Sequence, residues 1–79
     1  MEDQARHNYE YDVVLEGDTA PARVVRMVGQ GKRVLEVGAG PGSITRHLQG
    51  HGGCTITGVE LDAVAIKLLS PYCDMVYQA

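Results

Sequence analysis

The feature of this sequence that most constrains its fold is a glycine-rich segment, 38–42, with glycine at every second position. It directly follows the apolar, β-branched run 33–37, which predicts a short buried strand. Beyond it, Ile44 and Leu48 lie four residues apart and predict a helix over 43–49. Glycine lets the backbone turn sharply and lets a ligand approach main-chain atoms that a Cβ would block. The segment therefore predicts a strand, a ligand-binding turn and a helix in succession.

A further helix is expected before this unit. Asp18 and Thr19 can each cap it, Pro21 suits its first turn, and Gly29 ends it. Residues 1–12 lack a periodic apolar pattern and are polar, and we interpret 1–17 as an N-terminal arm.

The remaining residues continue the alternation of strands and helices. A second strand is predicted over 54–59, where apolar and polar residues alternate, and a third is predicted to start at 75–77. Between them, Asp62 can cap a helix that ends before Pro71. Strands that alternate with helices over short connections form parallel sheets, so the sequence predicts an α/β fold. The apolar face of the last helix contains Ala65, Leu68 and Leu69.

Charge and composition restrict the expected partners. The 79 residues include 10 acidic and 7 basic ones, for a formal charge of −3, so no excess of Lys and Arg attracts a nucleic acid or an anionic membrane. The first residues are polar and acidic, where a signal peptide needs a basic start and an apolar stretch. We therefore expect a cytoplasmic protein that does not bind membranes, and the charge does not favour a nucleic-acid partner.

Metal binding and disulfide formation are not expected. Cys54 and Cys73 are too few for a disulfide framework, and they lack the further ligands of a zinc site. We predict that both are reduced core residues. The three histidines show no metal-ligand spacing with a cysteine or an acidic cluster.

Glu36 distinguishes between the nucleotide ligands that a glycine-rich turn can bind. Gly42 is followed by Ser43 and not by the Lys of a P-loop, which argues against a nucleoside triphosphate. Glu36 stands near the end of the first strand, where the pyrophosphate of a dinucleotide would place a second negative charge at high cost. A carboxylate suits a cationic ligand instead, and a sulfonium amino-acid nucleoside carries both an ammonium and a sulfonium group.

Glu60 is the predicted partner of a ribose. It follows Gly40 by 20 residues and stands at the carboxyl end of the second strand. A carboxylate there can accept hydrogen bonds from both ribose hydroxyls, as in NAD or S-adenosylmethionine. Glu60 thus indicates a nucleoside, whereas Glu36 and Gly42 favour S-adenosylmethionine. The competing structural interpretation of Glu60 is a solvated acid at the start of a helix.

Two motifs in this chain resemble those of the class I S-adenosylmethionine-dependent methyltransferases. The sequence VLEVGAGPG at 34–42 is similar to their first motif, and TGVELD at 57–62 is similar to their second. The resemblance covers 18–79. It implies the first half of a three-layer, Rossmann-like parallel sheet with strand order 3-2-1, and S-adenosyl-L-methionine as the cofactor.

The resemblance also implies the residues of the cofactor site. Glu36 would lie near the ammonium end of the cofactor, Glu60 would bind the ribose diol, and Leu61 would contact the adenine ring. The loop passing under the methionine part contributes Gly38, Ala39, Gly40 and Gly42.

The family has a larger sheet than 79 residues can form. The sequence stops at 78–79, before the fourth strand, where the family keeps much of its acceptor chemistry. We therefore expect 18–79 to be the N-terminal half of a cofactor-binding domain that is truncated and inactive alone. No catalytic residue can be assigned.

The function expected from the resemblance is methyl transfer to a small-molecule or polysaccharide-pathway acceptor. The segment 36–45 is also similar to ribosomal RNA adenine dimethyltransferases, so RNA is a second candidate acceptor. The sequence is also compatible with a non-catalytic nucleoside-binding or assembly module and, less well, with a nicotinamide-dependent dehydrogenase.

The implied strand order leaves the first strand, 33–37, as an open edge. An apolar edge strand without a neighbour readily pairs with another chain. We therefore expect a homodimer formed through this edge.

Overall fold

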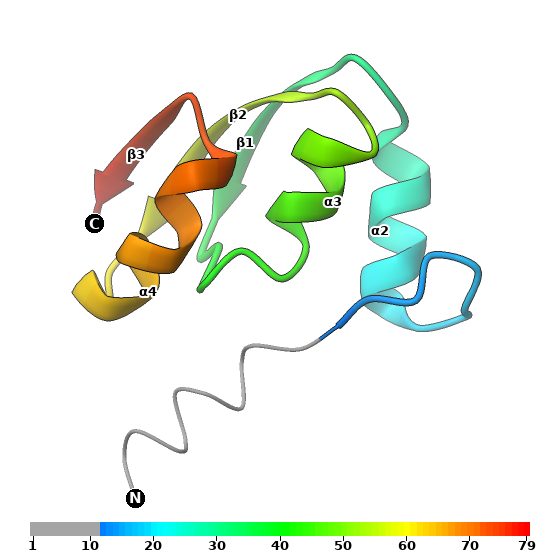
Figure 1. The fold of residues 1–79 in the computed structure, drawn as a ribbon, viewed down its shortest axis with the longest axis horizontal. Coiled ribbons are helices and arrows are strands. Elements are labelled where there is room, and N and C mark those ends of the chain that lie inside the picture. The colour runs from blue at the N-terminus through cyan, green and yellow to red at the C-terminus, as the bar shows by residue number, and fades with distance from the viewer. Residues whose placement is uncertain (1–11) are drawn as a thin grey trace, which may run out of the picture.

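A parallel sheet of three strands organises the computed structural model, which describes residues 12–79 (Figure 1). Its strands are β1 (Arg33–Val37), β2 (Thr55–Glu60) and β3 (Met75–Gln78), in the spatial order β1-β2-β3 with both pairs parallel. The predicted strand order is confirmed, and the predicted strand ends agree with the observed ones to within one residue. Most of the predicted N-terminal arm, 1–11, lies outside the described residues.

The helix before the sheet, α2 (Ala20–Val28), starts and ends where its capping residues predict. The Thr19 hydroxyl accepts a hydrogen bond from the Ala22 amide at 3.3 Å. The helix ends at Gly29, whose φ of 81° is one that glycine adopts without strain.

The helix after the glycine-rich segment, α3 (Thr45–Gly50), begins two residues later than predicted. The preceding residues form turns: the Arg46 amide bonds to the Gly42 carbonyl and the His47 amide to the Ile44 carbonyl, both at 3.0 Å. The side chain of Ile44, at the N-cap position, makes no capping hydrogen bond. Turns therefore precede the regular helix, and the spacing of apolar residues alone does not predict them.

The last helix, α4 (Ala63–Leu69), begins after Asp62 as predicted, and the Asp62 carboxylate accepts a hydrogen bond from the Val64 amide at 3.1 Å. A 3-10 turn, η1 (Ser70–Tyr72), continues it and contains Pro71. Leu69 is fully buried as expected, whereas the prediction that Leu68 lies on the buried face is wrong, because its side chain is 45% exposed. No helix within residues 12–79 is long and apolar enough to cross a membrane.

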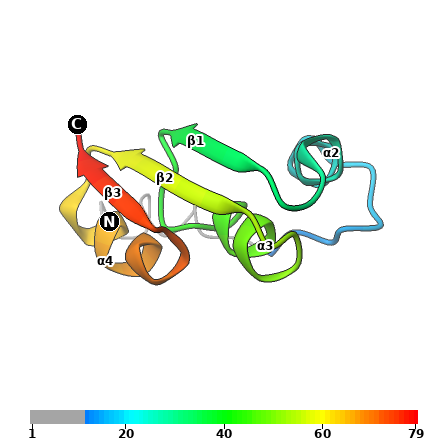
Figure 2. The same ribbon diagram turned by 90° about the horizontal axis from the view of Figure 1, so that it is seen from above.

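Helices α3 and α4 cover one face of the sheet (Figure 2). The core beneath them is formed by Val25, Leu48, Cys54 and Ile56. Both cysteines are free, but only Cys54 is buried. Cys73 is partly exposed, which corrects the prediction of two core cysteines.

The opposite face of the sheet is uncovered within residues 12–79. The strand register places two rows of side chains there, 35/57/75 and 37/59/77. Leu35 and Val37 are 66% and 73% exposed, and Met75 and Tyr77 are also exposed. The third layer of the expected architecture is therefore not among the described residues, and β1 forms both an apolar surface and an edge of the sheet.

We predict that β1 pairs with β1 of a second copy in an antiparallel, two-fold arrangement centred on Leu35. Leu35→Lys is then expected to convert a dimer into a monomer in analytical ultracentrifugation, because it places two like charges opposite each other on the axis. The control is Val14→Lys, which removes a side chain of similar exposure, 65%, away from the sheet. A monomeric wild-type chain would contradict the edge pairing.

Candidate cofactor-binding site

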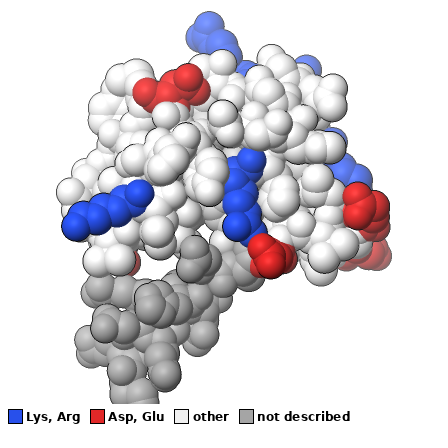
Figure 3. Space-filling view, in the orientation of Figure 1, with Lys and Arg blue, Asp and Glu red and all other residues white. Residues whose placement is uncertain are grey.

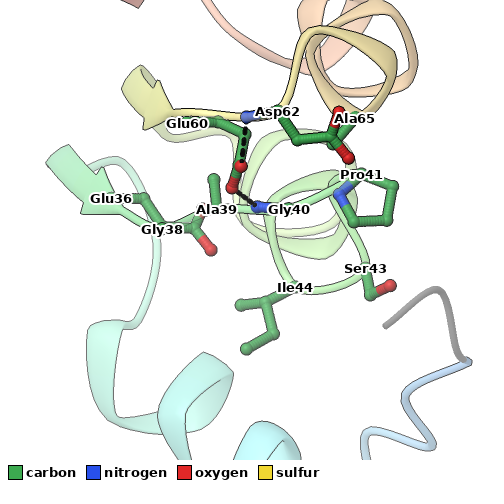
Figure 4. A pocket seen from close by; sticks show the side chains of 10 residues that line it. All are labelled: Glu36, Gly38, Ala39, Gly40, Pro41, Ser43, Ile44, Glu60, Asp62 and Ala65. Carbon is green, nitrogen blue, oxygen red and sulfur yellow. Dashed lines mark hydrogen bonds between the residues drawn. The ribbon is translucent and has the colours of Figure 1, made fainter. Parts of the chain in front are cut away.

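A cavity of about 370 Å³ opens at the carboxyl ends of β1 and β2 (Figure 4). Ligands of open α/β sheets bind at this end of the strands, where the connecting loops diverge. Its lining residues come from the end of β1, the glycine-rich loop, the end of β2 and the start of α4: Glu36, Gly38, Ala39, Gly40, Pro41, Ser43, Ile44, Glu60, Asp62 and Ala65.

The glycine-rich loop begins by crossing the end of β2. The amides of Gly38 and Ala39 both bond to the Val59 carbonyl, at 2.8 and 3.2 Å. Gly38 and Gly40 have φ values of 69° and 62°, which side chains rarely allow. A Cβ at either position would meet no atom within 4 Å, so the backbone angle and not close packing calls for glycine here. The predicted use of these glycines for close ligand approach stays a prediction.

Glu60 connects the glycine-rich loop to the start of α4. Its Oε1 atom accepts a hydrogen bond from the Gly40 amide at 2.7 Å, and its Oε2 atom accepts one from the Asp62 amide at 2.8 Å. Figure 4 shows the carboxylate between these two amides. Glu60 is therefore more than a solvated acid at a helix start. Each carboxylate oxygen has a second lone pair, so ribose hydroxyls can still bond to it.

Glu36, in β1, lines the same cavity and is partly buried. Thr45, at the start of α3, donates its hydroxyl hydrogen to Glu36 Oε1 at 2.5 Å. Burial raises the pKa of Glu36 above its ordinary value, and the hydrogen bond from Thr45 opposes this rise. A bound cation would favour the ionised form of Glu36 further.

The charge of the cavity has one sign. Three of its lining residues are acidic, Glu36, Glu60 and Asp62, and none of the lining residues is Lys, Arg or His. Such a cavity repels the pyrophosphate of a dinucleotide and attracts a ligand with an ammonium or sulfonium group. Glu36, predicted to favour a cationic ligand, and Glu60, predicted to bind a ribose, thus line the same cavity.

Two of the seven predicted site residues do not line this cavity. Gly42 is buried with a φ of 97°, and a Cβ there would lie 3.0 Å from Cδ2 of Tyr72, so this glycine allows close packing against η1. Leu61 follows Glu60 but lines an adjacent, open depression and is 72% exposed. Its predicted contact with adenine stays a prediction.

Sequence reasoning did not assign several residues of the site. Asp62 is predicted as a helix cap, yet it also lines the cavity, and its position two residues after Glu60 is the available signal. Thr45 contacts Glu36 from nine residues away, across a loop whose path the sequence does not give. The other lining residues without an assignment are Pro41, Ser43, Ile44 and Ala65.

The fold has a counterpart among solved structures. It matches a TehB-like S-adenosylmethionine-dependent methyltransferase from Corynebacterium glutamicum with a TM-score of 0.59 and 19% sequence identity, over 99% of this chain and 40% of that one. The predicted Rossmann-like methyltransferase fold is therefore confirmed. The chain spans less than half the length of that protein. No curated protein matches the sequence.

The family follows from the sequence match. Residues 19–70, about two thirds of the 79, match the family described as methionine biosynthesis protein MetW. The chain belongs to this family. The matched region includes the whole glycine-rich loop and both of the carboxylates at the ends of β1 and β2.

Proposed function

We propose that this chain binds S-adenosylmethionine in the cavity at the ends of β1 and β2 and forms the cofactor-binding part of a methyltransferase. The observation that carries the proposal is the set of three carboxylates around a glycine-rich loop, without a basic residue in the cavity lining. The fold match to an S-adenosylmethionine-dependent methyltransferase and the family membership support it. When bound, the cofactor supplies a methyl group activated by its sulfonium.

The residues of the chain have separate roles in this proposal. Glu60 binds the ribose hydroxyls and holds the loop, and Glu36 accepts the ammonium group of the methionine part. Gly38 and Gly40 let the cofactor approach the backbone, because both line the cavity and neither has a side chain. Positioning of the methyl group is thus the contribution of these residues to transfer.

We further propose that the acceptor is a small molecule. The family description names methionine biosynthesis, which concerns small metabolites and supports this class over polysaccharide or RNA. The arginines on α2 give no support to RNA: Arg23 pairs with Asp18 at 2.7 Å, and Arg26 bonds to the carbonyl of Leu15 at 2.6 Å. Figure 3 shows basic side chains scattered singly over the visible face.

Isothermal titration calorimetry of the 79-residue chain tests the proposal. We expect S-adenosylhomocysteine to bind with micromolar affinity and NAD not to bind at the same concentrations, since the cavity repels a pyrophosphate. Binding of NAD but not S-adenosylhomocysteine would favour a dehydrogenase. Absence of binding by either ligand would overturn the proposal and leave a non-catalytic assembly module.

A further inference from the structure

Thr45 occupies an unusual position for a polar residue. Its side chain is completely buried, at 0% exposure, at the first position of α3. Its hydroxyl does not bond to the backbone of its own helix but donates to Oε1 of Glu36 on β1 at 2.5 Å. A hydrogen bond to a charged group is among the stronger ones in proteins, so this contact fixes the carboxylate relative to α3.

The hydroxyl of Thr45 is important because the other groups around Glu36 do not stabilise a negative charge there. Glu60, from β2, and Asp62, before α4, line the same cavity, and the thiol of Cys73 lies close enough for the charge of Glu36 to contribute to its raised pKa, after burial. None of these groups supplies a positive charge. His47, two residues after Thr45, lies about 200° around α3 and thus on its opposite side. Thr45 is therefore the described group that favours the ionised form of Glu36.

We propose that Thr45 is a positioning residue of the cofactor site, an inference that rests on the proposed function. It holds the Glu36 carboxylate in one orientation and in its ionised form, ready to accept the ammonium group of the cofactor. A carboxylate has about four lone-pair sites, so the bond from Thr45 leaves acceptor capacity for the ligand. The threonine itself acts through Glu36 and does not contact the cofactor.

The test is the pH profile of ligand affinity for Thr45→Val, measured by calorimetry between about pH 5 and pH 8. S-adenosylhomocysteine carries the ammonium group, whereas 5′-methylthioadenosine lacks the amino acid. Affinity for S-adenosylhomocysteine falls as Glu36 becomes protonated on acidification. In Thr45→Val this fall is expected about one pH unit higher than in the wild type, because the lost hydrogen bond favoured the ionised form. Affinity for 5′-methylthioadenosine is expected to stay unchanged.

Matched variants separate positioning from packing. Thr45→Ser keeps the hydroxyl and is expected to restore the wild-type pH profile. Thr57→Val makes the same chemical change on the uncovered face of the sheet and is expected to leave the pH profile unchanged. If Thr45→Val does not fold, Thr45→Ala differs from Thr45→Ser by the hydroxyl alone and gives the same comparison. Thermal unfolding followed by circular dichroism establishes folding.

Two outcomes distinguish the inference from the proposed function. A wild-type chain that does not bind S-adenosylhomocysteine overturns the proposed function. A wild-type chain that binds it, together with a hydroxyl-free variant whose pH profile is unshifted or whose affinity falls equally for both ligands, overturns the role of Thr45.

Discussion

Replacing Glu60 with Ala is expected to lower the affinity for S-adenosylhomocysteine by about 100-fold or more, because hydrogen bonds to a charged group contribute about 1.5–3 kcal/mol each and two ribose hydroxyls lose their acceptor. The substitution also removes the contacts of Glu60 with the Gly40 and Asp62 amides, at 2.7 and 2.8 Å. We therefore expect a simultaneous fall in Tm of about 12 °C or more. Calorimetry and thermal unfolding measure the two effects separately.

Asp74 provides a matched control for the Glu60 variant. Its carboxylate also accepts a hydrogen bond from a backbone amide, that of Ile56 at 2.8 Å, but it does not line the cavity. Asp74→Ala removes one such bond where Glu60→Ala removes two, so it is expected to lower Tm by about half as much and to leave the affinity for S-adenosylhomocysteine unchanged. An Asp74 variant that binds as weakly as Glu60→Ala, or a Glu60 variant that binds like the wild type, would refute the ribose assignment.

Gly58→Ala is expected to destabilise the chain by about 1–3 kcal/mol, with a fall in Tm of about 5–15 °C. Gly58 lies in β2, the central strand, beneath α4. A Cβ there would lie 3.0 Å from Sγ of Cys73 and 3.2 Å from Cδ2 of Leu69, which is fully buried and has little room to move. Such a loss is a large fraction of the stability of a domain of this size.

Gly50→Ala controls for the general effect of adding a methyl group. Gly50 is the last residue of α3, and a Cβ there would meet no atom within 4 Å, so the change is expected to be neutral or slightly stabilising. Cys73→Ala removes the sulfur and is expected to restore part of the stability of Gly58→Ala in a double-mutant cycle. Additive effects of the two substitutions would show that the steric account of Gly58 is wrong.

The strands and helix caps could be predicted because their signals are local. The apolar run at Arg33–Val37 and the capping residues Thr19 and Asp62 determine their elements through neighbours close in sequence. The start of α3 and the exposure of Leu68 depend on how the loop winds into the helix and how α4 packs on the sheet. Such tertiary effects override helical periodicity, so the sequence pattern alone does not contain them.

The acidic residues of the candidate site could be predicted from the sequence, whereas the hydrogen bonds that they accept could not. Glu36 and Glu60 follow from their positions at strand ends, because parallel strands bring these ends to one edge of the sheet. The two backbone amides that bond to Glu60 and the hydroxyl of Thr45 come from loops and a helix whose paths require the folded chain. Gly42 resembles the other loop glycines in sequence, yet it packs against Tyr72.

The most direct test of the central claim is a titration of the ¹⁵N-labelled chain with S-adenosylhomocysteine, followed by NMR. Binding in the cavity predicts large shifts for the amides of Gly38, Gly40 and Asp62, because these residues line it (Figure 4). The amides of α2 (Ala20–Val28), away from the cavity, are expected to stay unchanged. Unchanged loop amides at saturating ligand, or shifts confined to other parts of the chain, would contradict an S-adenosylmethionine site at the ends of β1 and β2.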